Sequence, residues 1–346
     1  MIVALTVLFP LLRLLDGRAP RSCTSRAGLP ALPPVPTTPS LIGTSLLSTL
    51  TKVSSPNGPV ESLAPPSQGG GSPPRNCQCG YILTRHTDAY FPLARYTDFS
   101  DLQEGRVPPQ RLKDKGWVVT DGYGVGAPGP DGTTPFGSID TFSASDGVLQ
   151  LTMPGGQAKR GKVRVAEMAF DTPKGMTGGV FTMQAQLDGM GGTCQAMFTY
   201  HKDELEGDEQ DIEVLGRTIH ASGDDGTPQG IQLSNWDPSG SGKNELKINP
   251  FSNDPTHGFH NYTIAWLPEG TRYLYDGEEL NSPTKYPSTH PSSLIINHWT
   301  NGDKAFTQGP PPTDVVMRIK SIVLYYETPE TPGLPDNCSL EDACRV

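Results

Sequence analysis

The sequence lacks aromatic side chains over one long stretch. None occurs from Pro10 to Gly80, where Pro, Ser, Thr and Gly dominate. A chain of this composition buries too little apolar surface to offset its conformational entropy. We interpret residues 20–75 as a disordered linker and expect the folded part to span residues 76–346.

The chain also lacks an excess of positive charge. It has 27 Lys and Arg against 37 Asp and Glu, for a net charge of −10. This balance argues against nucleic acid and anionic lipid as partners, because both require a basic surface. A neutral polysaccharide sets no charge requirement and is compatible with it.

No apolar run is long enough to span a bilayer, which takes about 20 residues. Met1 to Leu12 is apolar and typical of a secretory signal, although no basic residue precedes it and Arg13 interrupts it. We interpret residues 1–19 as a signal peptide; the alternative is a misplaced start. The polar C-terminus carries no lipid-anchor signal. We expect an extracellular or cell-wall protein, a monomer without a membrane anchor.

Four of the six cysteines lie at the ends of the expected domain. Cys77 and Cys79 open it, and Cys338 and Cys344 close it. Domain ends often lie close together, so disulfides between the two pairs would join them, and four cysteines allow three pairings. We expect Cys194 to be a buried thiol.

Short apolar runs with Gly, Pro or Asp breaks predict many strands and no long helix. Asp98 to Lys115 is a helix or an ordered loop in this interpretation. The expected strands are Gly137–Ser143, Val148–Met153, Val163–Phe170, Gly179–Leu187, Gln195–Tyr200, Gln210–Leu215, Gly230–Trp236, His260–Trp266, Thr271–Tyr275, Ser293–Trp299 and Val315–Tyr326. This pattern indicates a β-sandwich or barrel.

Three carboxylates alternate along one of these strands. Glu209, Asp211 and Glu213 would share one face, because successive strand side chains point to opposite faces. Glycosidic bond cleavage uses one ionised carboxylate and one carboxylic acid, and closely spaced charges separate two pKa values. The alternative is a solvated acidic strand face.

The segments around this row resemble glycoside hydrolase family 16. Met197-Phe-Thr-Tyr200 and Asp208-Glu-Gln-Asp-Ile-Glu-Val-Leu-Gly216 are similar to the catalytic strands of the lichenases, and two later stretches, 258–277 and 294–302, agree in order. Cys77-Gln-Cys-Gly-Tyr81 resembles the start of secreted fungal members. The resemblance implies an all-β fold, a concanavalin A-like, lichenase-type β-jelly-roll sandwich with a concave substrate cleft.

The resemblance also implies roles. Glu209 would be the nucleophile of a retaining endo-β-glucanase, Glu213 the acid and base, and Asp211 an assisting group. The positions that resemble sugar contacts are Glu167, Phe198, Tyr200, Gln232, Trp236, Asn297 and Trp299. For the aromatic residues the alternative is core packing.

Several questions stay open at this stage. Departures from the lichenase pattern at Ala169, Gly207 and Gln210 leave the glucan linkage unassigned. A transglycosylase would use the same carboxylates, and a lectin-like module would bind glucan without cutting it. We expect no cofactor. The resemblance implies a structural calcium ion, but nothing singles out Asp88, Asp98, Asp140 or Asp314 as ligands. The histidines at 201, 220, 257, 260 and 298 show no metal-ligand spacing.

Overall fold

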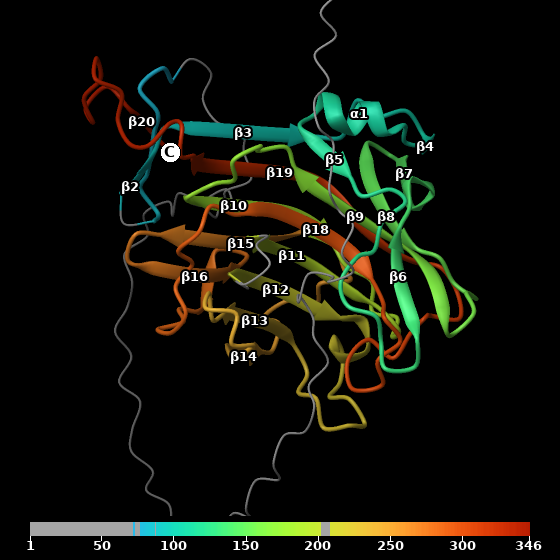
Figure 1. The fold of residues 1–346 in the computed structure, drawn as a ribbon. Coiled ribbons are helices and arrows are strands. Elements are labelled where there is room, and N and C mark those ends of the chain that lie inside the picture. Colours follow the sequence, from blue (N-terminus) through green and yellow to red (C-terminus); the bar gives the residue numbers. More distant parts are fainter. Residues whose placement is uncertain (1–71, 73–76, 87, 202–207) are drawn as a thin grey trace, which may run out of the picture. The chain divides into compact units, whose positions relative to one another are not determined.

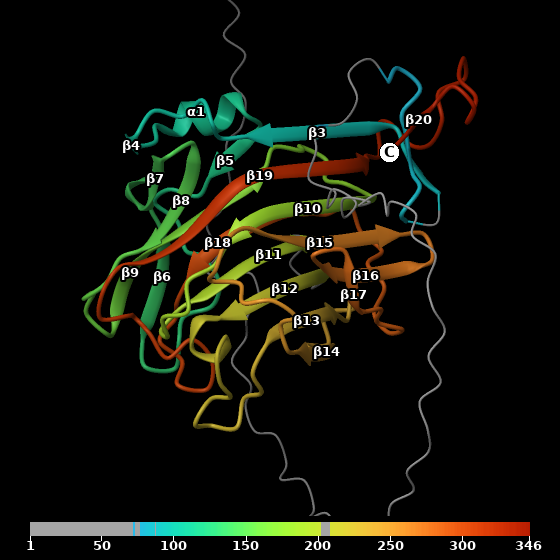
Figure 2. The same ribbon diagram turned by 180° about the vertical axis from the view of Figure 1, so that it is seen from behind.

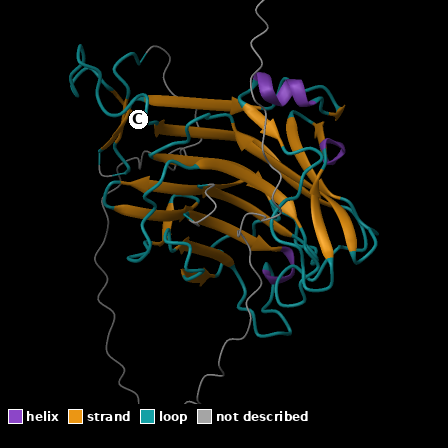
Figure 3. Ribbon diagram, viewed as in Figure 1, coloured by secondary structure: helices purple, strands orange, loops and turns teal. Residues whose placement is uncertain are grey.

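The computed structural model describes residues 72, 77–86, 88–201 and 208–346, and these fold into a sandwich of two antiparallel sheets (Figure 1). Helix is scarce in this part of the chain: Figure 3 shows α1 (Pro109–Asp114) and two single turns, η1 (Ile139–Thr141) and η2 (Gly216–Thr218). The all-β prediction is confirmed. The expected signal peptide, residues 1–19, and the expected linker, residues 20–75, lie outside the described residues apart from residue 72.

One sheet has nine strands, with β10 and β19 at its centre (Figure 2). Its order is β17-β16-β15-β10-β19-β8-β7-β4, and β3 pairs with β19. The strands are β3 (Leu93–Asp98), β4 (Gly105–Arg106), β7 (Phe142–Ser145), β8 (Val148–Met153), β10 (Gly178–Gln186), β15 (His260–Leu267), β16 (Gly270–Tyr275), β17 (Glu278–Asn281) and β19 (Val315–Glu327).

The second sheet has eight strands and contains the acidic row. Its order is β14-β13-β12-β11-β18-β9-β5, and β6 pairs with β9. The strands are β5 (Trp117–Val119), β6 (Thr133–Gly137), β9 (Gly161–Phe170), β11 (Cys194–Tyr200), β12 (Glu209–Leu215), β13 (Ile231–Trp236), β14 (Asn244–Asn249) and β18 (Ser293–Trp299).

The main core lies between these sheets. Met197, Ile212 and Leu233 from the eight-stranded sheet join one buried apolar cluster with Phe181 and Ile264 from the nine-stranded sheet. Since one face of the eight-stranded sheet is buried in this way, its other face is left for a binding surface.

A small third sheet joins the two ends of the domain. It consists of β2 (Ala89–Phe91), β1 (Tyr81–Leu83) and β20 (Cys344–Arg345), and Figure 1 shows it at the corner that holds the C-terminus. Disulfides connect Cys77 with Cys344 and Cys79 with Cys338. The expected cross-link between the two cysteine pairs is confirmed. Cys194 is buried, as expected.

The strand prediction is wrong at Gly137–Ser143 and misses β14 as well as the short strands β1 to β6, β17 and β20. The expected strand Gly137–Ser143 is broken by η1, because the Ser138 hydroxyl accepts a hydrogen bond from Asp140 N and turns the chain. The edge strand β14 was not predicted, because its mixed polar sequence has no clear apolar alternation. No helix among the described residues has the length and apolarity needed to cross a membrane.

The two disulfides close nearly the same long loop, with sequence separations of 267 and 259 residues. With one bridge intact, the other closes a ring on the order of ten residues and contributes about 2–3 kcal/mol in the chain-entropy model. The long loop is released only when both bridges are gone. We therefore expect Cys77→Ser/Cys344→Ser and Cys79→Ser/Cys338→Ser each to lower the free energy of unfolding by this amount. The quadruple variant should lose more than the sum, measured by urea denaturation; strictly additive losses would contradict this account.

Candidate active site

Strand β12 has two chemically different faces. Ile212 and Val214 enter the main core, whereas Glu209, Asp211 and Glu213 lie on the opposite face. All seven residues of the strand are buried. The alternation expected from the sequence is therefore present, and the acidic row is not a solvated face in this structure.

The cross-strand register places all ten expected site residues on this same face, because directly paired residues in a sheet share a face. Three rows cross the sheet: Trp236–Glu209–Tyr200–Ser293, Ser234–Asp211–Phe198–Ile295–Ala169–Val118, and Gln232–Glu213–Ala196–Asn297–Glu167. Trp299 follows on the same face, paired with Cys194. The acidic row thus has an aromatic or amide neighbour on both sides.

These side chains differ in exposure. Glu209, Asp211 and Phe198 are 1, 2 and 3% exposed, whereas Tyr200 and Trp236 are partly exposed. The two partly exposed rings lie on either side of Glu209.

Trp299 is fully buried. Its ring packs 6.3 Å from the ring of Phe306, and a Cβ placed on Gly126 would lie 3.1 Å from it. It belongs to a second apolar cluster with Val163 and Val165 of β9. The structure thus gives Trp299 a packing role, which was the alternative to a sugar contact.

Asp211 is held by two neighbours on β13. Its Oδ2 accepts hydrogen bonds from Trp236 Nε1 at 2.6 Å and Ser234 Oγ at 2.7 Å. Burial raises the pKa of Asp211 to about 6, although these two donors and Glu209 act to lower it. The carboxyl nevertheless titrates as one of a coupled pair with Glu209.

Burial of the Glu209 carboxyl is offset less by hydrogen bonds than burial of Asp211. Burial raises the pKa of Glu209 well above the ordinary value, and Asp211, Glu213 and Asp208 raise it further by charge repulsion. Its Oε1 has no hydrogen-bond partner among the residues that the structure describes. Because Asp211 has two additional donors, its pKa is raised less than that of Glu209.

The other two carboxylates of the face have different partners. Cys194 Sγ lies 3.9 Å from Glu213 Oε1. Glu167 accepts hydrogen bonds from Thr120 Oγ1 at 2.8 Å and Asn297 Nδ2 at 3.4 Å, and burial raises its pKa. This face of the sheet therefore carries several buried carboxyl groups, and burial raises the pKa values of Glu167, Glu209 and Asp211.

Polar contacts also hold β12 from behind. Gln210 Oε1 accepts a hydrogen bond from Thr271 Oγ1 of the nine-stranded sheet at 2.5 Å, and Asn235 Nδ2 donates to the same hydroxyl at 3.1 Å. Tyr273 OH bonds to Asn235 Oδ1 at 2.6 Å. This network accounts for Gln210, which occupies a position where the lichenase pattern has an apolar residue.

Asp208 fixes the chain at the start of β12. It is fully buried, and its Oδ2 accepts hydrogen bonds from Thr289 N at 2.6 Å and His290 N at 2.8 Å. The residues before and after Glu209 are thus both tied to other parts of the domain.

The four aspartates that were available as calcium ligands, none of them singled out by the sequence, each have another partner. Asp88 pairs with Arg345, Asp140 pairs with Arg106, Asp98 accepts from Ser100 N and Asp314 accepts from Gly155 N. Across the described ranges, no group of three or more His, Cys, Asp or Glu side chains is arranged to hold a metal ion.

The model of glycosyl hydrolases family 16 matches residues 137–318, more than half of the chain and the part that holds all ten site residues. The chain belongs to family 16. A β-glucanase of Bacillus subtilis is 30% identical over 110 residues, which cover 31% of this chain and 41% of the relative. A xyloglucan endotransglucosylase/hydrolase of Arabidopsis thaliana is 31% identical over 131 residues, which cover 36% and 42%. The chain spans about half the length of the curated relatives it matches, between 41% and 53%.

Solved structures support the family 16 fold. A lichenase from a mouse hindgut metagenome aligns with a TM-score of 0.51 and 20% identity, over 68% of this chain and 99% of that one. A β-glucanase of Bacillus licheniformis aligns with a TM-score of 0.51 and 18% identity, over 68% and 98%. The expected jelly-roll sandwich is confirmed.

Some contacts of the acidic face were not predicted. Ser234 shares strand parity with Gln232 and Trp236, so the sequence held a signal for it. Thr120 lies 47 residues from Glu167, and only the folded chain brings them together. Val118 is 43% exposed at the edge of the sheet. It extends the middle row because β5 pairs with β9, and this pairing is seen only in the folded chain.

The raised pKa values make stability depend on pH. A carboxyl whose pKa is higher in the folded than in the unfolded state contributes stability at low pH, and this is lost as the pH rises through the folded value. For Asp211, a rise from 3.8 to about 6 corresponds to about 3 kcal/mol. We expect Glu209→Gln to be more stable than the wild type at pH 7, on the order of 1 kcal/mol or more, and equal to it near pH 4.

Urea denaturation at both pH values measures this difference. Glu278→Gln is the control, because Glu278 is an exposed strand glutamate outside the row. If Glu209→Gln and Glu278→Gln changed the free energy of unfolding equally at pH 7, the charge repulsion proposed at buried Glu209 would be contradicted.

Proposed function

We propose that this family 16 protein is a retaining glycoside hydrolase that cleaves internal β-glucosidic bonds of glucans. The observation that carries the proposal is the register of the eight-stranded sheet, which sets the acidic row between aromatic and amide side chains. Flat aromatic rings pack on the apolar face of a pyranose, and carboxylates and amides bond its hydroxyls.

In the proposed mechanism Glu209 attacks the anomeric carbon and Glu213 protonates the leaving oxygen. A covalent glycosyl-enzyme results, and Glu213, now ionised, takes a proton from the water that releases the sugar from Glu209. Asp211 receives the Glu209 proton along the hydrogen bond between them, and Ser234 and Trp236 hold Asp211 in place to receive it.

For the substrate contacts we propose Tyr200 and Trp236 as sugar-stacking rings, and Gln232 and Asn297 as partners for hydroxyls. Gln232 Nε2 and Asn297 Oδ1 are buried and have no hydrogen-bond partner in the described part of the chain, so a bound sugar would satisfy them. Glu167 and Phe198 complete the proposed contact surface. Trp299 is retained as a candidate, with its packing role the alternative.

A transglycosylase is the second candidate. The observation in its favour is the similarity to xyloglucan endotransglucosylase/hydrolase proteins of Arabidopsis thaliana, whose description includes both reactions. A sugar hydroxyl would then replace water at the glycosyl-enzyme. A lectin-like module is less well supported, because a buried row of three carboxylates costs stability that a pure binder does not need.

We further propose that the protein is secreted or resides in a cell wall. Two disulfides join the ends of the domain, and such bonds persist mainly in oxidising compartments. The substrate class fits this location, since cell-wall glucans are extracellular.

Azide rescue tests the two roles of the glutamates. With an activated β-glycosyl fluoride and azide, Glu209→Ala should yield the α-glycosyl azide, of inverted configuration, because the anion occupies the space of the missing carboxylate and attacks from that side. Glu213→Ala, given a β-glycoside with an activated leaving group, should yield the azide of retained configuration, because only the second step lacks its base. Wild-type activity in both variants on a panel of β-1,3-, β-1,4- and mixed-linkage glucans would refute the assignment, and binding without turnover by the wild type would favour the lectin-like module.

The pH profile tests the role of Ser234. Removing its hydrogen bond raises the pKa of Asp211, because that bond stabilises the ionised form. A hydrogen bond to a charged group contributes about 1.5–3 kcal/mol, so we expect Ser234→Ala to move the acidic limb of kcat/KM upward by about one pH unit. Ser143→Ala on β7 of the other sheet is the control. An unchanged acidic limb in Ser234→Ala would show that Asp211 does not set it.

A further inference from the structure

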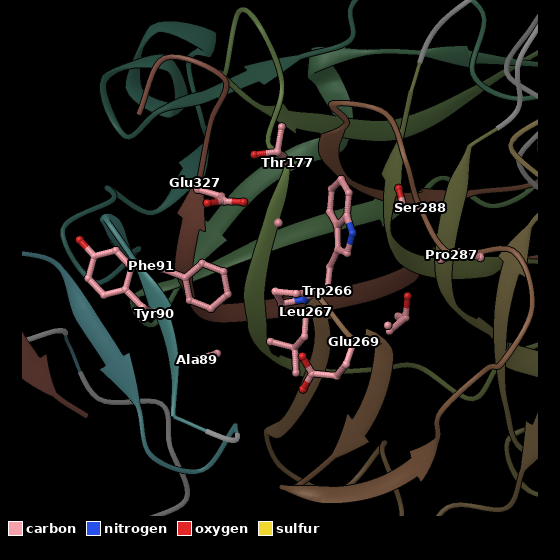
Figure 4. A pocket seen from close by; sticks show the side chains of 14 residues that line it. Ala89, Tyr90, Phe91, Thr177, Trp266, Leu267, Glu269, Pro287, Ser288 and Glu327 are labelled. Atoms are coloured by element: carbon pink, nitrogen blue, oxygen red, sulfur yellow. The ribbon is translucent and has the colours of Figure 1, made fainter. Parts of the chain in front are cut away.

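A cavity of about 540 Å³ lies outside the acidic face. It is formed by β2, by the ends of β15 and β19, by the starts of β10 and β16, and by Pro287 and Ser288 (Figure 4). Its strands belong to the nine-stranded and the small sheet, whereas the acidic row lies on the free face of the eight-stranded sheet. Its volume falls in the range of about 300–1,000 Å³ that is usual for ligand sites.

The cavity combines aromatic and polar walls. Figure 4 shows the Trp266 indole as one wall, with Phe91 and Tyr90 from β2 on another side. The carboxylates of Glu327 and Glu269 line it as well. Aromatic rings beside carboxylates are suited to a ligand with one apolar face and many hydroxyl donors.

One hydroxyl group of the lining has no partner among the described residues. Ser288 Oγ is buried and makes no hydrogen bond to them. A buried hydroxyl without a partner costs free energy, and a ligand hydroxyl would remove that cost. No Lys, Arg or His lines the cavity, which disfavours an anionic ligand. Glu269 already pairs with Arg272 at 3.1 Å, so the lining does not carry two uncompensated charges for a dication.

We propose that this cavity is a second saccharide-binding site that takes one or two residues of a neutral glucan. Trp266, which is 6% exposed, forms an apolar wall of the cavity, and Glu327, Glu269 and Ser288 bond the hydroxyls. The site does no chemistry and holds a glucan segment apart from the acidic row. The proposal does not depend on cleavage at Glu209.

The cavity is connected to the acidic row through the protein. Thr271 lines it and bonds Gln210, the residue after Glu209. Pro287 and Ser288 line it and lead directly into Thr289 and His290, whose backbone N–H groups bond Asp208, the residue before Glu209. A bound saccharide thus rests against the two segments that position Glu209.

The indole N–H groups of Trp266 and Trp236 allow binding at the cavity to be distinguished from binding at the acidic face. Trp266 Nε1 reports the cavity, and Trp236 Nε1, bonded to Asp211, reports the acidic face. We expect cellobiose and laminaribiose, titrated into ¹⁵N-labelled full-length protein, to shift the Trp266 indole resonance in a saturable way. The same shift should occur in Glu209→Ala. The resonance is assigned with Trp266→Phe.

Ser288→Trp, which fills the cavity, and Glu327→Gln should weaken the binding seen at Trp266 at least tenfold, and Glu278→Gln should leave it unchanged. Circular dichroism verifies that each variant is folded. A shift of Trp236 without Trp266 would overturn the second site and leave the proposed function intact. A shift of Trp266 in a protein that cleaves no glucan would support the second site and count against the proposed function. No shift of Trp266 with either disaccharide would overturn the proposal.

Discussion

The alternation of β12 is the constraint on which the rest of the domain depends. Every residue of the strand is buried, so each side chain must find partners on the face to which it points. Ile212 and Val214 meet the apolar core, and Glu209, Asp211 and Glu213 meet one another. The neighbouring strands supply what this arrangement needs: donors from β13 on one side and aromatic rings from β11 on the other.

Burial of the acidic row destabilises the fold, and the surrounding structure reduces this destabilisation. Two hydrogen bonds stabilise the Asp211 carboxylate, and the raised pKa of Glu209 favours its neutral form. Behind the strand, Gln210 connects to Thr271 of the opposite sheet. A buried polar network of this kind is favourable only when its members are satisfied, and then it fixes one arrangement of the sheets. Stability is therefore traded for a set of carboxyl groups held at fixed positions with separated pKa values.

Much of this site could be predicted from the sequence because the side chains of a strand alternate between its two faces with a period of two residues. The faces of β12, β13 and β18 follow from that period once each strand is recognised, and all ten expected residues do share one face. The period could not tell which aromatic rings remain accessible. Trp299 is buried because Gly126 and Phe306, from distant segments, cover it. Likewise, Thr120 meets Glu167 only because β5 pairs with β9, and Thr271 meets Gln210 only because the two sheets pack face to face.

The cross-linked ends have a consequence for a protein exposed to proteases. Because Cys77 is bonded to Cys344 and Cys79 to Cys338, the domain is covalently a ring. A cut in an exposed turn, such as the one around Ser241 and Gly242 between β13 and β14, opens that ring without releasing a fragment. Both pieces stay attached at the corner where the ends meet, and the paired strands keep them together. A single nick therefore changes the path of the chain but not the neighbours of the acidic row.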